Sequence, residues 1–146
     1  MKETDRDRAT RALALAARSL ERAVGGSDLT LAQFRVLSLV AAGDERSSLL
    51  ADRLAVAKPT ITAVVDGLVE RGLLMRAAVV GDRRSIRLSL TRDGSNALRT
   101  AERATGTALD AILVHARDRD ALVAALVDLD EALAARSQAR LGEVRS

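Results

Sequence analysis

Apolar side chains recur every three or four positions along most of the chain, which is the spacing of helices that each bury one face. The first such pattern covers residues 4–24 and ends at Gly25 and Gly26. Another helix is expected to begin at Thr30, because Thr30 and Gln33 have the spacing of a capping box. The N-terminal part therefore predicts two helices joined by a short connection.

Two closely spaced helices are predicted next. The third helix is short, with Ser47 or Ser48 as its N-cap, and ends near Leu54. Pro59 suits the first turn of a fourth helix, because its missing N–H group would be unpaired there. Gly72 fits the left-handed position after the last turn of that helix. The buried face of the fourth helix is expected to consist of Ile61, Val64, Val65 and Leu68.

The hydrophobic period then shortens to that of a half-buried strand. Apolar residues alternate clearly at Ile86, Leu88 and Leu90, and a charged hairpin tip is predicted over residues 81–84. A weaker alternation before the tip places Met75, Ala77 and Val79 on one face of the preceding strand.

Two further helices complete the chain. Thr91 is predicted to cap a long helix that reaches about Ala116, and Asp118 to cap the last helix. The predicted fold is a single, mainly α domain over residues 1–146, with a small β-hairpin.

The order helix, short helix, tight turn, helix and β-hairpin predicts a winged helix-turn-helix, whose second helix can enter the major groove of double-stranded DNA. This lobe is expected to span residues 29–94. Residues 1–25 and 95–146 are predicted to form dimerisation helices, because the lobe has its own core and leaves their apolar stripes for a second copy to bury. The predicted dimer residues are Leu13, Leu20, Leu122, Leu126, Leu129 and Leu133.

The charge distribution favours a polyanionic partner. The chain has a net charge of only +3, but residues 58–92 hold seven basic and three acidic side chains. A positive middle segment is typical of nucleic-acid binding. A solvated surface in an arginine-rich chain is the alternative interpretation.

The outer face of the fourth helix is small and polar near its N-terminus. Thr60 and Thr62 can bond phosphates or bases, and Asp66 can accept a hydrogen bond from cytosine N4. Arg83 or Arg84 can enter a narrow minor groove from the hairpin, and an ordinary solvated surface is the alternative for each group. Ser47 and Ser48 are phosphate candidates as well as caps. The predicted DNA-binding set is Ser47, Ser48, Lys58, Pro59, Thr60, Thr62, Ala63, Asp66, Arg83, Arg84 and Arg87.

The segments Leu54–Leu74 and Gly81–Thr91, together with Gly94, resemble the multiple-antibiotic-resistance regulator (MarR) family. The most specific part is D-x-R in the hairpin, followed by an alternating strand that ends in Leu-Thr. The resemblance implies a bacterial cytoplasmic repressor or activator that is dimeric through its terminal helices and often released from DNA by a small ligand. It also implies that Asp82 and Arg84 pair at the hairpin tip.

Catalytic and metal chemistry find no support in the sequence. The chain has no cysteine and one histidine, His115, which excludes disulfides and a typical zinc site. His115 is expected to be an ordinary, partly buried side chain. We expect no enzyme and no cofactor. The lack of a long apolar segment predicts no signal peptide, no membrane partner and a cytoplasmic location.

A small-molecule effector is expected to bind between the lobe and the dimer helices. Arg11 and Arg18 are candidate partners for an amphipathic anion, and Phe34 is the single aromatic ring. The alternative function is a winged-helix module for protein–protein interaction without an operator. The basic hairpin favours DNA, because an interaction module has no need of a positive wing.

Overall fold

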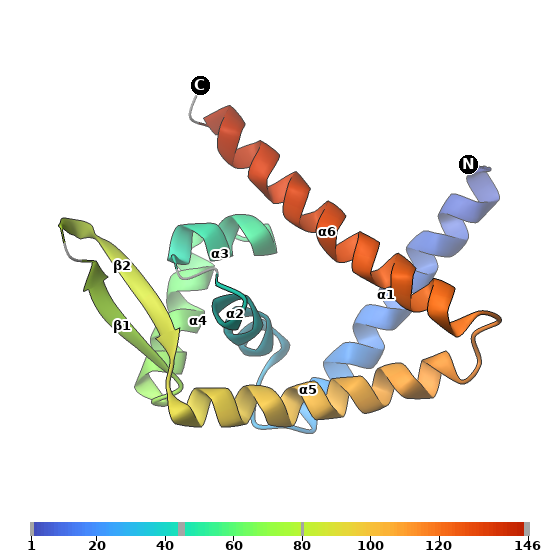
Figure 1. Cartoon of the computed structure of the whole chain (residues 1–146), viewed down its shortest axis with the longest axis horizontal. Coiled ribbons are helices and arrows are strands. Elements are labelled where there is room, and N and C mark those ends of the chain that lie inside the picture. Colours follow the sequence, from blue (N-terminus) through green and yellow to red (C-terminus); the bar gives the residue numbers. More distant parts are fainter. Residues whose placement is uncertain (1, 44–45, 80, 145–146) are drawn as a thin grey trace.

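The structure is a computed structural model that describes residues 2–43, 46–79 and 81–144. The elements are α1 (Glu3–Gly25), α2 (Leu31–Ala41), α3 (Ser47–Leu54), α4 (Lys58–Glu70), β1 (Leu74–Val79), β2 (Asp82–Leu90), α5 (Arg92–Leu113) and α6 (Arg119–Val144). Figure 1 shows a lobe of α2, α3, α4 and the hairpin at one end of α5. Helix α1 extends away from this lobe, whereas α6 begins beyond the far end of α5 and runs back toward α3. The mainly α, winged helix-turn-helix fold that the sequence predicts is confirmed.

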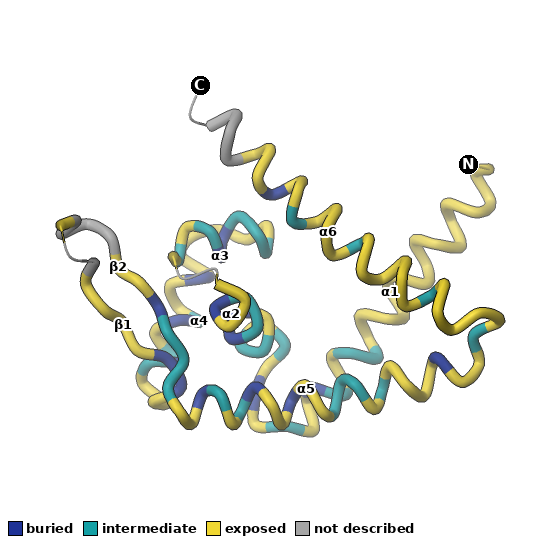
Figure 2. The backbone as a smooth tube through the Cα atoms, viewed as in Figure 1, coloured by how far each residue is buried: buried dark blue, intermediate teal, exposed yellow. Residues whose placement is uncertain are grey.

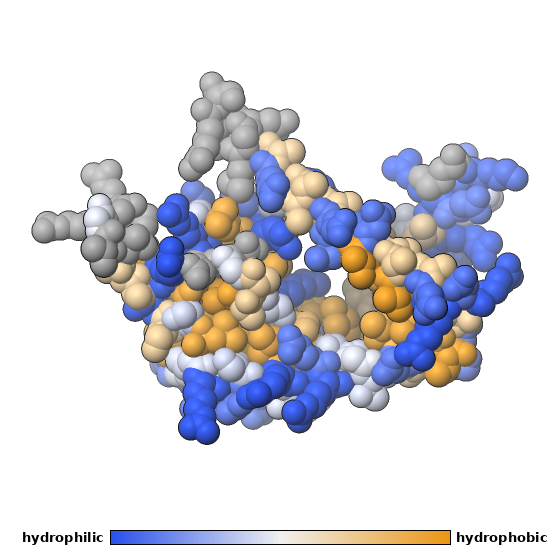
Figure 3. All heavy atoms as spheres, in the orientation of Figure 1, coloured by the Kyte–Doolittle hydropathy of each residue, from blue (hydrophilic) through white to orange (hydrophobic). Residues whose placement is uncertain are grey.

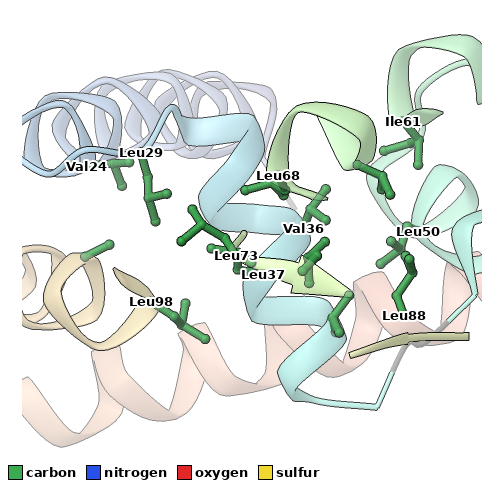
Figure 4. Packing of buried hydrophobic residues seen from close by; sticks show 14 of the residues in the cluster. Val24, Leu29, Val36, Leu37, Leu50, Ile61, Leu68, Leu73, Leu88 and Leu98 are labelled. Carbon is green, nitrogen blue, oxygen red and sulfur yellow. The ribbon is translucent and has the colours of Figure 1, made fainter. Parts of the chain in front are cut away.

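The lobe has a continuous aliphatic core. Helix α2 runs through the middle of the buried side chains in Figure 4. Leu37, Leu50, Leu68 and Leu88 come from four different elements and are fully buried. The end of α1 and the first half of α5 join this core through Val24, Leu98 and Ala101.

The capping predictions for three helices are confirmed. Thr30 Oγ1 accepts a hydrogen bond from the Gln33 N–H at 3.2 Å, and Gln33 Oε1 accepts one from the Thr30 N–H at 3.0 Å. Thr91 Oγ1 accepts from the Gly94 N–H at 2.9 Å. Asp118 accepts from a backbone N–H in the first turn of α6, also at 2.9 Å.

Helix α3 begins differently from the prediction. Arg46 is its N-cap, and no side chain caps the helix. The prediction that Ser47 or Ser48 is the N-cap is wrong, because the helix starts one residue earlier and places both serines inside its first turn. Helix α5 also ends at Leu113, before the expected end near Ala116.

The two strands pair antiparallel, with Leu74 opposite Leu90 and Arg76 opposite Leu88. Leu74 and Leu88 are buried, whereas Met75 is 51% exposed. Met75 and Ala77, which the sequence places on one face of this strand together with Val79, therefore lie on the face opposite the buried Leu74. The run of apolar residues at positions 73–75 leaves the phase of the alternation open in the sequence.

The hairpin turn is tighter than predicted. Strand β2 begins at Asp82, so residues 82–84 belong to the strand and not to the tip. Gly81 has φ +89°, a conformation that only glycine adopts at little cost. Ile86 is 51% exposed because the hairpin extends beyond the core of the lobe.

The base of the wing, the end of α4 and the start of α5 meet at one tightly packed junction. Thr91 Oγ1 donates to the Gly72 carbonyl at 2.6 Å, and the Thr91 N–H donates to the Leu73 carbonyl at 3.2 Å. A Cβ on Gly94 would lie 1.9 Å from the Leu73 carbonyl oxygen. Glycine at position 94 is therefore needed for α5 to approach the lobe.

The terminal helices are mostly exposed, as the yellow lengths of α1 and α6 in Figure 2 show. Val24 is the buried residue of α1, and Ser137 is the only buried one among the described side chains of α6. In Figure 3, apolar residues gather over the lobe and again over the helices at the other end. Within the described ranges, no helix is long and apolar enough to cross a membrane.

Candidate nucleic-acid interface

The turn between α3 and α4 consists of residues 55–57. Ala55 has φ +52° and ψ +41°, the left-handed conformation that usually favours glycine. The Ala55 N–H donates to the Asp52 carbonyl at 3.2 Å, and the Val56 N–H to the Ala51 carbonyl at 3.1 Å. These bonds close the end of α3 and set the direction in which α4 leaves it.

Helix α4 presents one face to the core and another to solvent. Ile61, Val65 and Leu68 are buried, as predicted, and Val64 is half-buried. The first turn holds no acidic residue and no side-chain cap. The positive end of the helix dipole is therefore available to an anion such as a DNA phosphate. The exposed predicted residues are Lys58, Pro59, Thr60, Thr62, Ala63 and Asp66.

The two threonines on this face differ in their hydrogen bonds. Thr62 Oγ1 donates to the Lys58 carbonyl at 3.0 Å, so its proton is engaged within the helix. Its lone pairs remain to accept a hydrogen bond. Thr60 lies two residues nearer the N-terminus and is exposed, which makes its hydroxyl the better donor toward a phosphate or a base.

Asp66 pairs with Arg76, a residue that the sequence did not single out. The contact joins α4 to β1, and both side chains are more than a third exposed. A base edge must therefore compete with the Arg76 guanidinium for the Asp66 carboxylate. The packing of the hairpin beside α4, which brings the two residues together, leaves no pattern in either segment alone.

The wing carries the other predicted contacts. Arg83 and Arg84 lie at the start of β2, and their side chains, like that of Asp82, fall outside the described part of the chain. The Asp82–Arg84 pair that the resemblance implies falls outside it too. Arg87 is exposed and lies opposite Ala77. In the first turn of α3, Ser47 is half-buried and Ser48 is exposed.

The predicted dimer residues lie on the terminal helices with much of their surface uncovered. Leu13 is 54% exposed, Leu133 is 50% exposed, and Leu126 is exposed as well. The remaining three, Leu20, Leu122 and Leu129, are half-buried.

The predicted effector residues lie on α1 and α2. Arg11 is exposed, Arg18 pairs with Glu21 at 2.9 Å on the surface, and Phe34 packs half-buried against the lobe core. A cavity of about 170 Å³ lies elsewhere, between α3 and α6. His115 is exposed, so the expectation of partial burial is wrong. No group of three or more described His, Cys, Asp or Glu side chains is placed to hold a metal ion.

Comparisons with known proteins agree with this architecture. A family model described as MarR family matches residues 27–85. The transcriptional repressor CouR of Rhodococcus jostii RHA1, in a structure bound to a 23-mer DNA duplex, is 32% identical, with a TM-score of 0.70. That match covers 83% of this chain and 86% of CouR. A comparison with curated protein sequences gave no match.

Two further solved structures share the fold. A MarR-family transcriptional regulator from Rhodococcus sp. RHA1 has a TM-score of 0.76 at 18% identity, covering 91% of this chain and 96% of its own. A MarR-family protein of Mycobacterium tuberculosis, in complex with salicylic acid, has a TM-score of 0.70 at 23% identity. That match covers 83% of this chain and 92% of the mycobacterial one.

Proposed function

Because this chain belongs to the MarR family of DNA-binding transcription regulators, we propose that it is a repressor that binds a pseudo-palindromic operator as a homodimer. The observation that carries the proposal is the exposed N-terminal half of α4, held on a tight turn beside a basic hairpin. In this arrangement α4 enters the major groove, while the wing follows the backbone or the minor groove.

The residues on α4 have separate roles in this proposal. Lys58 and the N-terminal N–H groups of α4 bind phosphate and set the register on the duplex. Thr60 and Thr62 contact base edges, with Pro59 and Ala63 small enough to allow close approach. Asp66 keeps α4 and the wing in one orientation through Arg76, and reads a base only when that pair opens.

The dimer in this proposal forms through α1, α5 and α6. Their uncovered leucines would expose apolar surface in a monomer. Burying that surface against a second copy stabilises the dimer by about 25 cal/mol per Å². Two linked lobes also raise affinity, because the second half-site binds at a high effective concentration. The predicted boundaries, a lobe over residues 29–94 and dimer segments over 1–25 and 95–146, are part of this proposal.

A small effector that releases the operator is the third element of the proposed function. The solved mycobacterial relative carries salicylic acid, which supports a ligand-responsive regulator here. The effector acts by its different affinity for the conformations with and without DNA. Cytoplasmic location follows from a role on chromosomal DNA.

Footprinting on the DNA upstream of the protein's own gene tests the proposal. The expected result is two related half-sites about 10 base pairs apart, centre to centre, which is one turn of the duplex. Protection of a single half-site by a monomer would contradict the dimer. Failure to bind any duplex, at low salt as well as high, would favour a protein–protein interaction module.

A further inference from the structure

One ion pair connects the two elements that the proposed function places on DNA. The Arg76 guanidinium, on β1, donates to a carboxylate oxygen of Asp66 on α4. Leu74 and Arg76 lie on the same face of the hairpin because side chains alternate along a strand, and Leu74 is buried. Arg76 therefore faces the lobe at the point where the hairpin passes beside α4 (Figure 1).

The attachment of the wing to the lobe does not depend on this pair. Thr91 forms hydrogen bonds with the carbonyls of Gly72 and Leu73 at the base of the wing. The Arg71 side chain donates to Gln33 Oε1 at 3.1 Å, which joins the end of α4 to α2. An exposed ion pair contributes little to folding stability. The pair can therefore open while α4 and the wing stay in place.

In the proposed complex, the phosphate backbone of the duplex passes over the pair. With α4 in the major groove and the wing at the neighbouring minor groove, the strand that divides the two grooves lies between them. Asp66 and Arg76 occupy this position, and both side chains are more than a third exposed. A guanidinium there can bind a phosphate, whereas an unpaired carboxylate would repel it.

The base opposite Asp66 decides whether the pair opens. Cytosine presents its N4 amino group in the major groove, and a carboxylate can accept a hydrogen bond from it. Thymine and guanine present acceptors there, so an Asp66 carboxylate released from Arg76 would find no donor. A charge left without a partner in an interface is costly. The pair should therefore open on cytosine and stay closed on thymine or guanine.

We propose that Arg76 is a specificity-determining residue that contacts a phosphate only where Asp66 binds a cytosine. This inference rests on the function proposed above and couples base recognition to a backbone contact. On the operator, Asp66 exchanges the Arg76 guanidinium for cytosine N4, and Arg76 binds the adjacent phosphate. At most sites on random duplex the pair stays closed and neither contact forms. One matching base thus adds two contacts, which increases the preference for the operator.

The double variant Asp66→Ala with Arg76→Gln removes the pair without changing the net charge. Salt titrations with the full chain measure its affinity for the operator and for a random duplex. Operator binding should weaken about 30-fold, with a salt slope lower by about one unit for each half-site. Binding to random duplex should keep its affinity and slope, because the closed pair makes no contact there. A lower slope on both duplexes would overturn the conditional contact, as would an unchanged slope on both.

Asp66→Ala alone should release Arg76 on every sequence. Affinity for random duplex is expected to rise about fivefold, and the salt slope to increase by about one unit for each protomer bound. Glu70→Ala is the matched control, because Glu70 is the other acidic residue of α4, is exposed and is not part of the pair. An equal rise in the two variants would assign the effect to lost negative charge and not to Arg76.

Operators in which each cytosine is replaced in turn by thymine identify the base that Asp66 reads. In the wild-type chain, one such replacement in each half-site should lower the salt slope by about one unit, because Arg76 then stays on Asp66. In Asp66→Ala the same replacement should leave the slope unchanged. If no cytosine behaves in this way, the proposed base contact is wrong.

These measurements keep the pair apart from the proposed function. Failure to bind any duplex would contradict the regulator itself. A protein that binds its operator, but whose double variant behaves alike on operator and random duplex, contradicts the conditional contact alone. Circular dichroism should find every variant folded, because the pair is exposed. If Arg76→Gln is unfolded, Arg76→Met takes its place and keeps most of the apolar stem.

Discussion

The winged lobe and the terminal helices use the same aliphatic residues but bury them to very different extents. In the lobe, Leu37 and Leu68 are fully buried by other elements of the same chain. On the terminal helices, Leu13 and Leu133 keep about half of their surface exposed. The lobe completes its core within the chain, with the end of α1 and the first half of α5, whereas the rest of the terminal helices leaves apolar side chains exposed. Hydrophobic content therefore does not show which region buries its own apolar side chains. In the proposed function, the lobe recognises DNA and the terminal helices form the dimer.

The largest expected effect comes from the junction that attaches α5 to the lobe. Gly94→Ala should lower the free energy of unfolding by about 3 kcal/mol, because a Cβ cannot fit against the Leu73 carbonyl without backbone movement. Urea unfolding measures the change. Gly67→Ala, at a helical position with no neighbour within 4 Å, is the matched control and should be neutral or stabilising. Equal effects of the two substitutions would contradict the close packing at Gly94.

A charge on α6 should separate assembly from folding. Leu126→Asp is expected to weaken the dimer about 100-fold, because it places one carboxylate from each copy in an apolar interface. Sedimentation velocity measures the dimer, and circular dichroism should find the lobe folded. Ala124→Asp introduces the same charge on another face of α6 and should have less effect. Loss of lobe structure in Leu126→Asp would mean that the two regions do not fold independently.

A change in the wing should alter DNA binding without touching either core. Arg83→Ala combined with Arg84→Ala should weaken operator and random duplex alike, by about tenfold, and lower the salt slope by about one unit per lost phosphate contact. A filter-binding titration over salt concentration measures both. Arg103→Ala, on an exposed position of α5, is the control. Unchanged affinity and slope in the double variant would remove the wing from the interface.

The smallest effect is expected in the turn between α3 and α4. Ala55→Gly should raise the free energy of unfolding by about 0.5–1 kcal/mol, because glycine adopts a positive φ without the Cβ penalty. Ala63→Gly, inside α4, should lower it by about 1 kcal/mol. Thermal melts at several denaturant concentrations resolve changes of this size. A destabilised Ala55→Gly variant would contradict the left-handed conformation.

Local patterns predict much of the lobe. The buried face of α4 follows from helical spacing alone, and the caps at Thr30 and Thr91 follow from side chains that bond the next turn. It is harder to predict which residues of β1 face the core. Positions 73–75 are all apolar, and the pairing with β2 decides which of them points inward. Nothing in the sequence of β1 itself selects the buried face.

Long-range contacts escape sequence reasoning altogether. Asp66 meets Arg76 only after the hairpin has packed beside α4. Ser137 and Arg53 reach one cleft from distant parts of the chain, so neither stands out in its own helix. None of the predicted effector residues Arg11, Arg18 and Phe34 lines this cleft.

The rigid attachment of α5 to the lobe has a mechanical consequence. The helix has 22 residues, and at 1.5 Å per residue it is about 33 Å long. Thr91 and Gly94 hold the first turn of α5 against the end of α4 and the base of the wing. A tilt of α5 therefore moves α4 and the wing together as one body. A tilt of about 5° displaces the far end by about 3 Å, close to the rise of one base pair. In the proposed dimer, such a tilt of α5 leaves the hydrophobic core intact. It nevertheless shifts one lobe relative to the other by about one base pair along the duplex.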